Sequence, residues 1–312
     1  MIFAGPARTA TVERFPGMFM ARPRPPGRKA AERRLWRLAT LERRQAFHLG
    51  EAVRAALQGS HEKAATHSGT ALSLSRELCA GAPRPAARHQ AGLAAALCNH
   101  ARYSSTPHAI ALLAESAGHY AALARADPAV YEVPRIDVLT TVALAADAAG
   151  STADAISLLR EVIRMYRRAP AADPAERDVG LARARFHLGR CLLKTGATAG
   201  GLAETDAGLT LADAAAERLG VSVRGPGWLG TAPRYLQLAA PDWAAAAVRA
   251  MTLHAAAGRY DSAAAAARTA VAVSGGLADL GGETFRQAHG QIRARADAIW
   301  ARAGQRWRTV AS

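Results

Sequence analysis

The sequence has few of the residues that build disulfide or zinc sites. Its three cysteines, Cys79, Cys98 and Cys191, lie far apart, are odd in number and form no CxxC pair. This pattern excludes a disulfide framework and a cysteine zinc centre, and we expect each thiol to be a small core residue. We therefore predict no metal ion and no cofactor.

Catalytic signatures are also missing. The ten histidines form no HExxH motif, the serines form no GxSxG motif, and no pair of carboxylates stands out for acid–base chemistry. One stretch, Gly225-x-Gly227-x-x-Gly230, formally matches the dinucleotide fingerprint. It lacks the strand that should precede it, and Pro226 and Pro233 interrupt the region. The sequence predicts no catalytic residue and a protein that is not an enzyme.

Long apolar runs are lacking as well. No run approaches the roughly 18 residues that a membrane span needs. The first 29 residues carry Arg8, Glu13 and Arg14 where a secretion signal would have an apolar core. We therefore expect a cytoplasmic protein that does not contact a membrane.

Positive charge is concentrated at the two ends of the chain. The formal net charge is +15, and only three lysines stand among the 40 basic residues. Residues 1–50 hold 11 basic and 3 acidic residues, and residues 286–312 hold 6 and 1, whereas residues 51–285 hold 23 and 21. An arginine and alanine excess fits the coding bias of a GC-rich genome. The alternative is a nucleic-acid-associated transcriptional regulator whose basic termini contact phosphates.

Composition indicates an all-α protein. Half of the residues are apolar, aromatic residues make up only 5%, and alanine, the best helix former, dominates. Residues 1–30 differ from the rest, because five prolines and scattered arginines leave too little apolar surface to fold. We predict that residues 1–30 are a disordered basic tail.

A small residue recurs at a fixed period along the remaining chain. These anchor residues are Ala64, Ala109, Ala155, Gly201 and Ala263. Five residues before each anchor stand Gly59, Ser104, Gly150, Gly196 and Gly258. A glycine or serine turn that joins two helices, followed by a small residue where the helices meet, predicts a stack of helical hairpins.

This pattern resembles the tetratricopeptide repeat. Leu188-Gly189 with Gly196, and Tyr260 after Gly258, match positions of that family. The period of about 45 residues is similar to that of kinesin light chains and many bacterial repeat proteins, as is Tyr166-Arg167-Arg168 followed by prolines. The resemblance covers about residues 45–275. It implies a right-handed α-solenoid of about five TPR-like hairpins that binds a protein or peptide.

Two segments depart from the regular period. The last two anchors are 62 residues apart, which places an insertion loop at about 219–241, within a repeat domain of residues 31–282. Trp228 and Tyr235 lie in this loop, and a small-ligand sensor or enzyme using it is a further alternative. We expect the helix after Ala263 to end at Gly275-Gly276. Residues 283–312 are predicted to form a C-terminal capping helix, spanning about Glu283–Ala303, and a basic tail.

The resemblance places polar side chains on the inner face of the solenoid. The expected inner residues are Arg102, Asp137, Asp147, Arg183, Arg190 and Lys194. Arg183, Arg190 and Lys194 recur at spacings of seven and four residues, so they share one stripe of a helix. Such a stripe suits an acidic peptide. The family's carboxylate clamp is not implied, because its asparagine positions hold residues such as Val53 and Cys98. We predict that another protein or peptide is the partner, bound by Arg102, Asp147, Arg183, Arg190, Lys194, Trp228 and Tyr235.

Overall fold

The protein is built from helices. The computed structural model describes residues 28–81, 86–104, 106–223, 225, 227–281 and 283–310. Within these ranges all regular structure is helical: α1 (Arg28–Leu57), α2 (His61–Ala80), α3 (Ala87–Ala101), α4 (Thr106–Ala126), α5 (Pro128–Ala148), α6 (Thr152–Arg168), α7 (Pro174–Lys194), α8 (Thr198–Arg218), α9 (Trp228–Thr231), α10 (Arg234–Ala256), α11 (Tyr260–Leu280) and α12 (Glu283–Val310). The all-α prediction is confirmed. Of the predicted tail, residues 1–27 lie outside the described residues, and residues 28–30 belong to α1.

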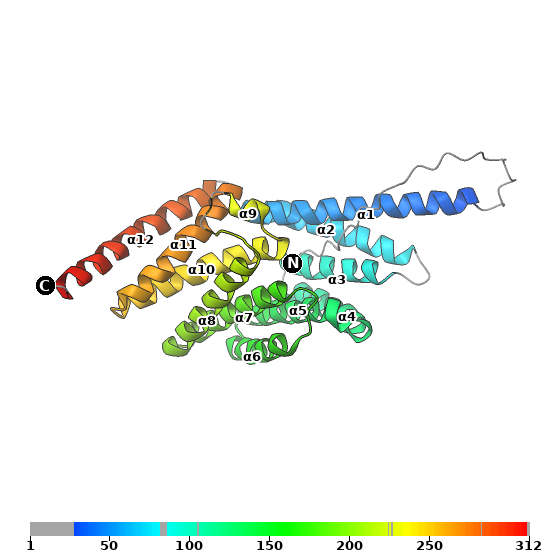
Figure 1. Ribbon diagram of the computed structural model, residues 1–312. Coiled ribbons are helices and arrows are strands. Elements are labelled where there is room, and N and C mark those ends of the chain that lie inside the picture. The colour runs from blue at the N-terminus through cyan, green and yellow to red at the C-terminus, as the bar shows by residue number, and fades with distance from the viewer. Residues whose placement is uncertain are drawn as a thin grey trace.

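The helices pack as hairpins that follow one another in chain order. The pairs α1–α2, α3–α4, α5–α6, α7–α8 and α10–α11 each pack together, and each hairpin packs on the next. Figure 1 shows the stack as an arc from α1 to α12. Each hairpin buries its apolar face only against its neighbours, which is how a helical repeat array is stabilised. The predicted solenoid of five hairpins is confirmed, and α12 packs on α11 as expected for a cap.

Four of the five hairpin turns share one backbone conformation. Gly59, Gly150, Gly196 and Gly258 have φ angles between 71° and 91°. In each turn the glycine N–H bonds a carbonyl three residues back, and the next N–H bonds one five residues back. This left-handed turn closes the first helix and favours glycine, which has no Cβ. The second hairpin has Ser104 instead, and no non-glycine residue in the described ranges has a positive φ.

The α7–α8 hairpin depends on close backbone contact. A Cβ built on Gly189 would lie 2.7 Å from the carbonyl oxygen of Gly201, and one on Gly201 would lie 2.8 Å from that of Gly189. About two turns further along α8, Gly208 leaves room for the ring of Phe186. The anchor Gly201 therefore does what the sequence predicted for small residues, because it lets two helices approach.

The insertion is shorter than predicted. Helix α8 ends at Arg218 and α10 begins at Arg234, so Tyr235 and Pro241 lie inside α10 rather than in a loop extending to 241. Pro241 is tolerated inside this helix. The start of α10 also contacts the first hairpin, because Arg234 Nη2 donates a hydrogen bond of 3.3 Å to the carbonyl of Gly50 in α1. The start of the fifth hairpin is thus linked to the first hairpin by this hydrogen bond.

The expected helix end at Gly275-Gly276 is wrong. Helix α11 continues to Leu280. The two glycines serve a different purpose, because a Cβ on Gly276 would lie 2.4 Å from Nε1 of Trp228. The indole of Trp228 packs there, edge to face with Trp243 at 6.1 Å between ring centroids. Gly276 therefore makes room for Trp228 of the insertion, whereas a Cβ on Gly275 would lie 3.5 Å from the ring of His289 on α12, and neither glycine ends the helix.

The final helix is longer than the sequence indicated. We expected it to span about Glu283–Ala303, and α12 runs to Val310. Residues 311–312 of the predicted basic tail lie outside the described residues.

Candidate binding face

The first helices of three successive hairpins lie side by side. Helix α7 contacts both α5 and α10, in addition to its chain neighbours α6 and α8. The inner face is defined here as the surface shared by α5, α7 and α10 together with the end of α3. The ion pairs described below join these helices directly.

Asp147 near the end of α5 is the centre of one ion-pair group. Its carboxylate lies 3.1 Å from Nη2 of Arg190 and 2.6 Å from Nζ of Lys194, both on α7, and accepts a hydrogen bond of 2.9 Å from Thr152. Burial raises the pKa of the Asp147 carboxyl. The hydrogen bonds from Lys194 and Thr152 and the charge of Arg190 outweigh burial, so the pKa lies below its ordinary value. The structure brings these three predicted residues together, and α5 is linked to α7 through them.

A second group joins α7 to α10. Nε of Arg183 donates to Oδ2 of Asp242 at 3.2 Å, and Nε2 of His187 lies 3.4 Å from the same oxygen. Burial raises the pKa of the Asp242 carboxyl, but His187 and Arg183 outweigh burial and hold that pKa well below its ordinary value. The side chain of Arg183 is only 7% exposed, so its carboxylate partner stabilises a charge that is largely removed from water.

Asp137 of α5 is turned away from the surface. It is 6% exposed, and its Oδ1 accepts a 2.5 Å hydrogen bond from the hydroxyl of Tyr166 on α6. Burial raises the pKa of the Asp137 carboxyl more than the nearby charge of Arg183 and the Tyr166 hydroxyl lower it. We had expected Asp137 on the inner face, and the structure places it inside the α5–α6 hairpin.

Sequence reasoning missed Arg249 on α10. This side chain is half-buried, and its Nε has no hydrogen-bond partner among the described residues. Burial and the charge of Arg190 lower its pKa, and Asp242 offsets them only in part. A signal was present in the sequence, because Asp242 and Arg249 are seven residues apart on α10, as Arg183 and Arg190 are on α7. The insertion before α10 lengthens the spacing between the last two anchors, so the correspondence between this pair on α10 and the pair on α7 was not recognised.

The two aromatic residues predicted to bind are largely occupied within the fold. Trp228 is 5% exposed, and its Nε1 donates to the carbonyl of Ala272 at 3.4 Å. Tyr235 is half-buried, and its hydroxyl donates to Oδ2 of Asp173 at 3.0 Å. Trp228 is therefore a core residue rather than an exposed loop aromatic. Tyr235 is the more accessible of the two residues, and ligand binding by the loop stays a prediction.

The C-terminal helix carries exposed arginines that have local partners. Arg286 pairs with Glu283 at 3.1 Å and Arg293 with Asp297 at 3.5 Å. The other basic segment, residues 1–27, lies outside the described residues, so the nucleic-acid alternative stays a prediction. In the part of the chain that the structure describes, no three His, Cys, Asp or Glu side chains cluster as metal ligands. No helix there has the length and apolar character to cross a membrane.

Comparison with known proteins gives a coarse structural likeness. No protein-family model matches the sequence, and no curated protein does. The chain is similar to a solved structure described as the crystal structure of BtubC (BKLC) from P. vanneervenii. The two share 12% identity at a TM-score of 0.47, over 81% of this chain and 93% of that one. At this level the likeness assigns no function, and what is established is an all-α array of helical hairpins.

Proposed function

We propose that this protein binds an acidic segment of another protein on its inner face and acts as a non-catalytic scaffold or regulatory module. Within this proposal the hairpins are tetratricopeptide-like repeats of the extended type, in a bacterial cytoplasmic protein. The proposal rests on the array architecture and on the charges of the inner face.

The observation that carries the proposal is an excess of positive charge on the inner face. Five cations lie there: Arg102, Arg183, Arg190, Lys194 and Arg249. Their ion pairs in the structure involve two carboxylates, Asp147 and Asp242. Arg190 and Lys194 remain 39% and 49% exposed, so a partner can reach them. An extended surface of this charge suits a peptide that supplies further carboxylates.

Arg190 and Arg249 are the most informative pair on this face. Each has an Nε atom that is buried without a hydrogen-bond partner. Burial lowers the pKa of Arg249, and the positive charge of Arg190 nearby lowers that pKa further. A carboxylate placed between them would relieve both effects, because a bidentate arginine–carboxylate contact satisfies the free donors.

The test measures binding of a defined peptide by fluorescence anisotropy. The probe is a labelled twelve-residue peptide of alternating Glu and Ala, compared with one of Gln and Ala. We expect the acidic peptide to bind more tightly and its affinity to fall as salt is added, because the attraction is electrostatic. The double variant Arg190→Gln/Arg249→Gln should weaken binding about tenfold.

The matched control removes the same charge from the outer side of the array. Arg160 and Arg167 are exposed on α6, and Arg160→Gln/Arg167→Gln should leave the affinity unchanged. Equal binding of the Glu and Gln peptides, or an equal loss in both double variants, would contradict the proposal.

A further inference from the structure

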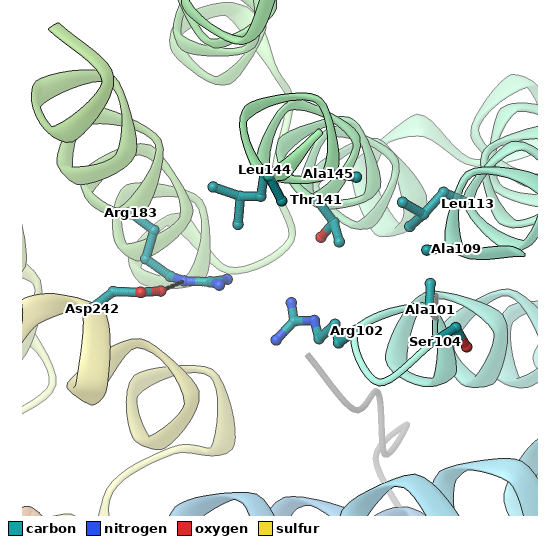
Figure 2. Close-up of a pocket in the computed structure, with 11 residues that line it drawn as sticks. Ala101, Arg102, Ser104, Ala109, Leu113, Thr141, Leu144, Ala145, Arg183 and Asp242 are labelled. Atoms are coloured by element: carbon teal, nitrogen blue, oxygen red, sulfur yellow. Dashed lines mark hydrogen bonds and ion pairs between the residues drawn. The ribbon is translucent and has the colours of Figure 1, made fainter. Parts of the chain in front are cut away.

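The inner face contains a cavity of about 340 Å³ next to the turn of the second hairpin. Figure 2 shows it between the end of α3, helices α4 and α5, and the Arg183–Asp242 pair that joins α7 to α10. Its volume lies at the lower end of the range for small-molecule sites, roughly 300 to 1,000 Å³. The cavity can therefore take a small molecule but not a folded segment.

Two guanidinium groups form the polar end of the cavity. Arg183 uses Nε for Asp242, and Figure 2 shows its terminal nitrogens directed toward the guanidinium of Arg102. Arg102 follows the last residue of α3 and is exposed. Two like charges that point toward each other repel, and an anion between them would turn this repulsion into two attractive contacts.

The lining retains an uncompensated positive charge. Asp242 is its one carboxylate, and that group is already engaged by Arg183 and lies 3.4 Å from His187. Arg102 has no carboxylate partner among the lining residues, and Asp137, whose carboxyl is near enough to feel the charges of Arg183 and Arg102, is buried outside the lining with a pKa that burial raises. A single negative charge supplied by a ligand would neutralise the site, which favours a monoanion over a dianion.

The opposite wall of the cavity is apolar. It is formed by Leu113 of α4 and by Leu144 and Ala148 of α5, with alanines between them. Burying an aliphatic group there contributes about 25 cal/mol per Å² of apolar area removed from water. A ligand that fills the site therefore needs an anionic head for the arginines and a short aliphatic body for the leucines.

We propose that this cavity binds a small aliphatic monocarboxylate, with its carboxylate between Arg102 and Arg183 and its hydrocarbon against Leu113 and Leu144. Planar guanidinium groups pair with carboxylates through two parallel hydrogen bonds, which fixes the orientation of the ligand. This site goes beyond the proposed peptide binding, because it needs no protein partner.

The experiment is calorimetric titration of the full chain with 4-methylpentanoate and with the matching neutral amide. We expect the acid to bind and the amide to bind at least about tenfold more weakly, because the amide lacks the charge that the two arginines recognise. Acetate should also bind more weakly than the six-carbon acid, because it leaves the leucine wall uncovered.

Three variants locate the binding site. Arg102→Gln should weaken binding of the acid about tenfold, and Ala148→Leu should weaken it by filling the cavity, while both residues are exposed enough for the fold to tolerate the change. Arg160→Gln on α6 removes the same charge elsewhere and should have no effect. Circular dichroism and thermal unfolding confirm that each variant is folded.

The outcomes separate this proposal from its alternatives. Equal affinity for acid and amide, no heat from either, or an equal loss in Arg160→Gln would overturn it. Binding of an acetylated Gly-Gly-Leu peptide with a free carboxylate, without binding of the free acid, would also overturn it and assign the cavity to chain ends. Failure of the Glu-Ala peptide assay leaves this result unaffected, because that assay depends on Arg190 and Arg249.

Discussion

The second and fourth hairpins share the spacing between turn and anchor residues, but their helices pack differently. At the position where α7 has Gly189, α3 has Leu97, and the anchor Gly201 of α8 corresponds to Ala109 of α4. The turn of the fourth hairpin contains Gly196 with φ +83°, whereas that of the second contains Ser104. The fourth hairpin brings two backbones together, and the second has the cavity beside its turn.

This difference indicates where the array can change without unfolding. Contact between backbones leaves no room for variation, because a carbonyl group cannot move aside as a side chain can. Contact through side chains leaves space that other residues can line, as Ala109 does in the cavity. The α7–α8 contact of the fourth hairpin thus contributes to stability, although α7 also supplies Arg183, Arg190 and Lys194 to the inner face, and the turn of the second hairpin leaves space beside it.

The largest effect is expected at the backbone contact of the fourth hairpin. Gly189→Val should lower the free energy of unfolding by about 3 kcal/mol, since its Cβ would meet a carbonyl oxygen at 2.7 Å. Urea unfolding followed by circular dichroism measures the change. The control is Gly200→Ala, an exposed glycine of α8 whose Cβ has only ordinary contacts, and it should raise stability by roughly 0.5 kcal/mol. If Gly189→Val lowers the free energy of unfolding by less than about 1 kcal/mol, α7 and α8 can move apart at little energetic cost.

The first turn of α7 should give the fourth hairpin a dependence on pH. Burial, Asp137 and Asp173 raise the pKa of the Glu176 carboxyl to about 7. The unfolded chain ionises this group near 4.5, so the folded protein loses stability as pH rises from 4.5 to about 7. Glu176→Gln removes that loss and should raise the free energy of unfolding by about 2 kcal/mol at pH 8.

The measurement for Glu176 is urea unfolding of both proteins at pH 4 and pH 8. At pH 4 the carboxyl is protonated in both states, and the two proteins should be equally stable within error. A constant difference at the two pH values would show that the variant acts by packing rather than by charge.

A smaller effect is expected at the turn of the fourth hairpin. Gly196→Ala places a Cβ at φ +83°, which costs about 1 kcal/mol, while nothing lies within 4 Å to clash with it. Thermal unfolding measures the loss. Gly150→Ala and Gly258→Ala occupy the same conformation and should give similar losses, and unequal losses would mean that the turns are not equivalent.

The smallest effect is expected at the turn of the second hairpin. Ser104→Ala removes a side-chain hydrogen bond to the carbonyl of His100 and adds no backbone strain, so it should change stability by less than about 0.5 kcal/mol. The same thermal unfolding assay applies. A loss as large as that of Gly196→Ala would erase the contrast between the two hairpins.

Local features of the chain were predictable. The anchor period placed all five hairpins, because a turn glycine and a small residue act within about 20 residues of one another. The resemblance to the repeat family also placed Asp147, Arg190 and Lys194 on the inner face, and the structure joins them by ion pairs. Gly275 and Gly276 misled for the same local reason, because glycine in a sequence indicates a helix end unless a distant side chain fills the space it leaves.

Contacts between distant hairpins were not predictable. Trp228 packs against α11, and Arg234 reaches Gly50 across 184 residues. No periodic pattern encodes such contacts, since they depend on the curvature that all the intervening hairpins accumulate. The same curvature brings Arg102 opposite Arg183 and creates the cavity.

The amino-acid sequence by itself determined the helices, their pairing and the small residues at which they meet. These depend on propensity and on contacts within one hairpin. The tertiary structure alone decided that Arg102 faces Arg183 and where space remains between hairpins. Small rotations between neighbouring repeats add along the array, and only their sum places the end of α3 beside α7 and α10.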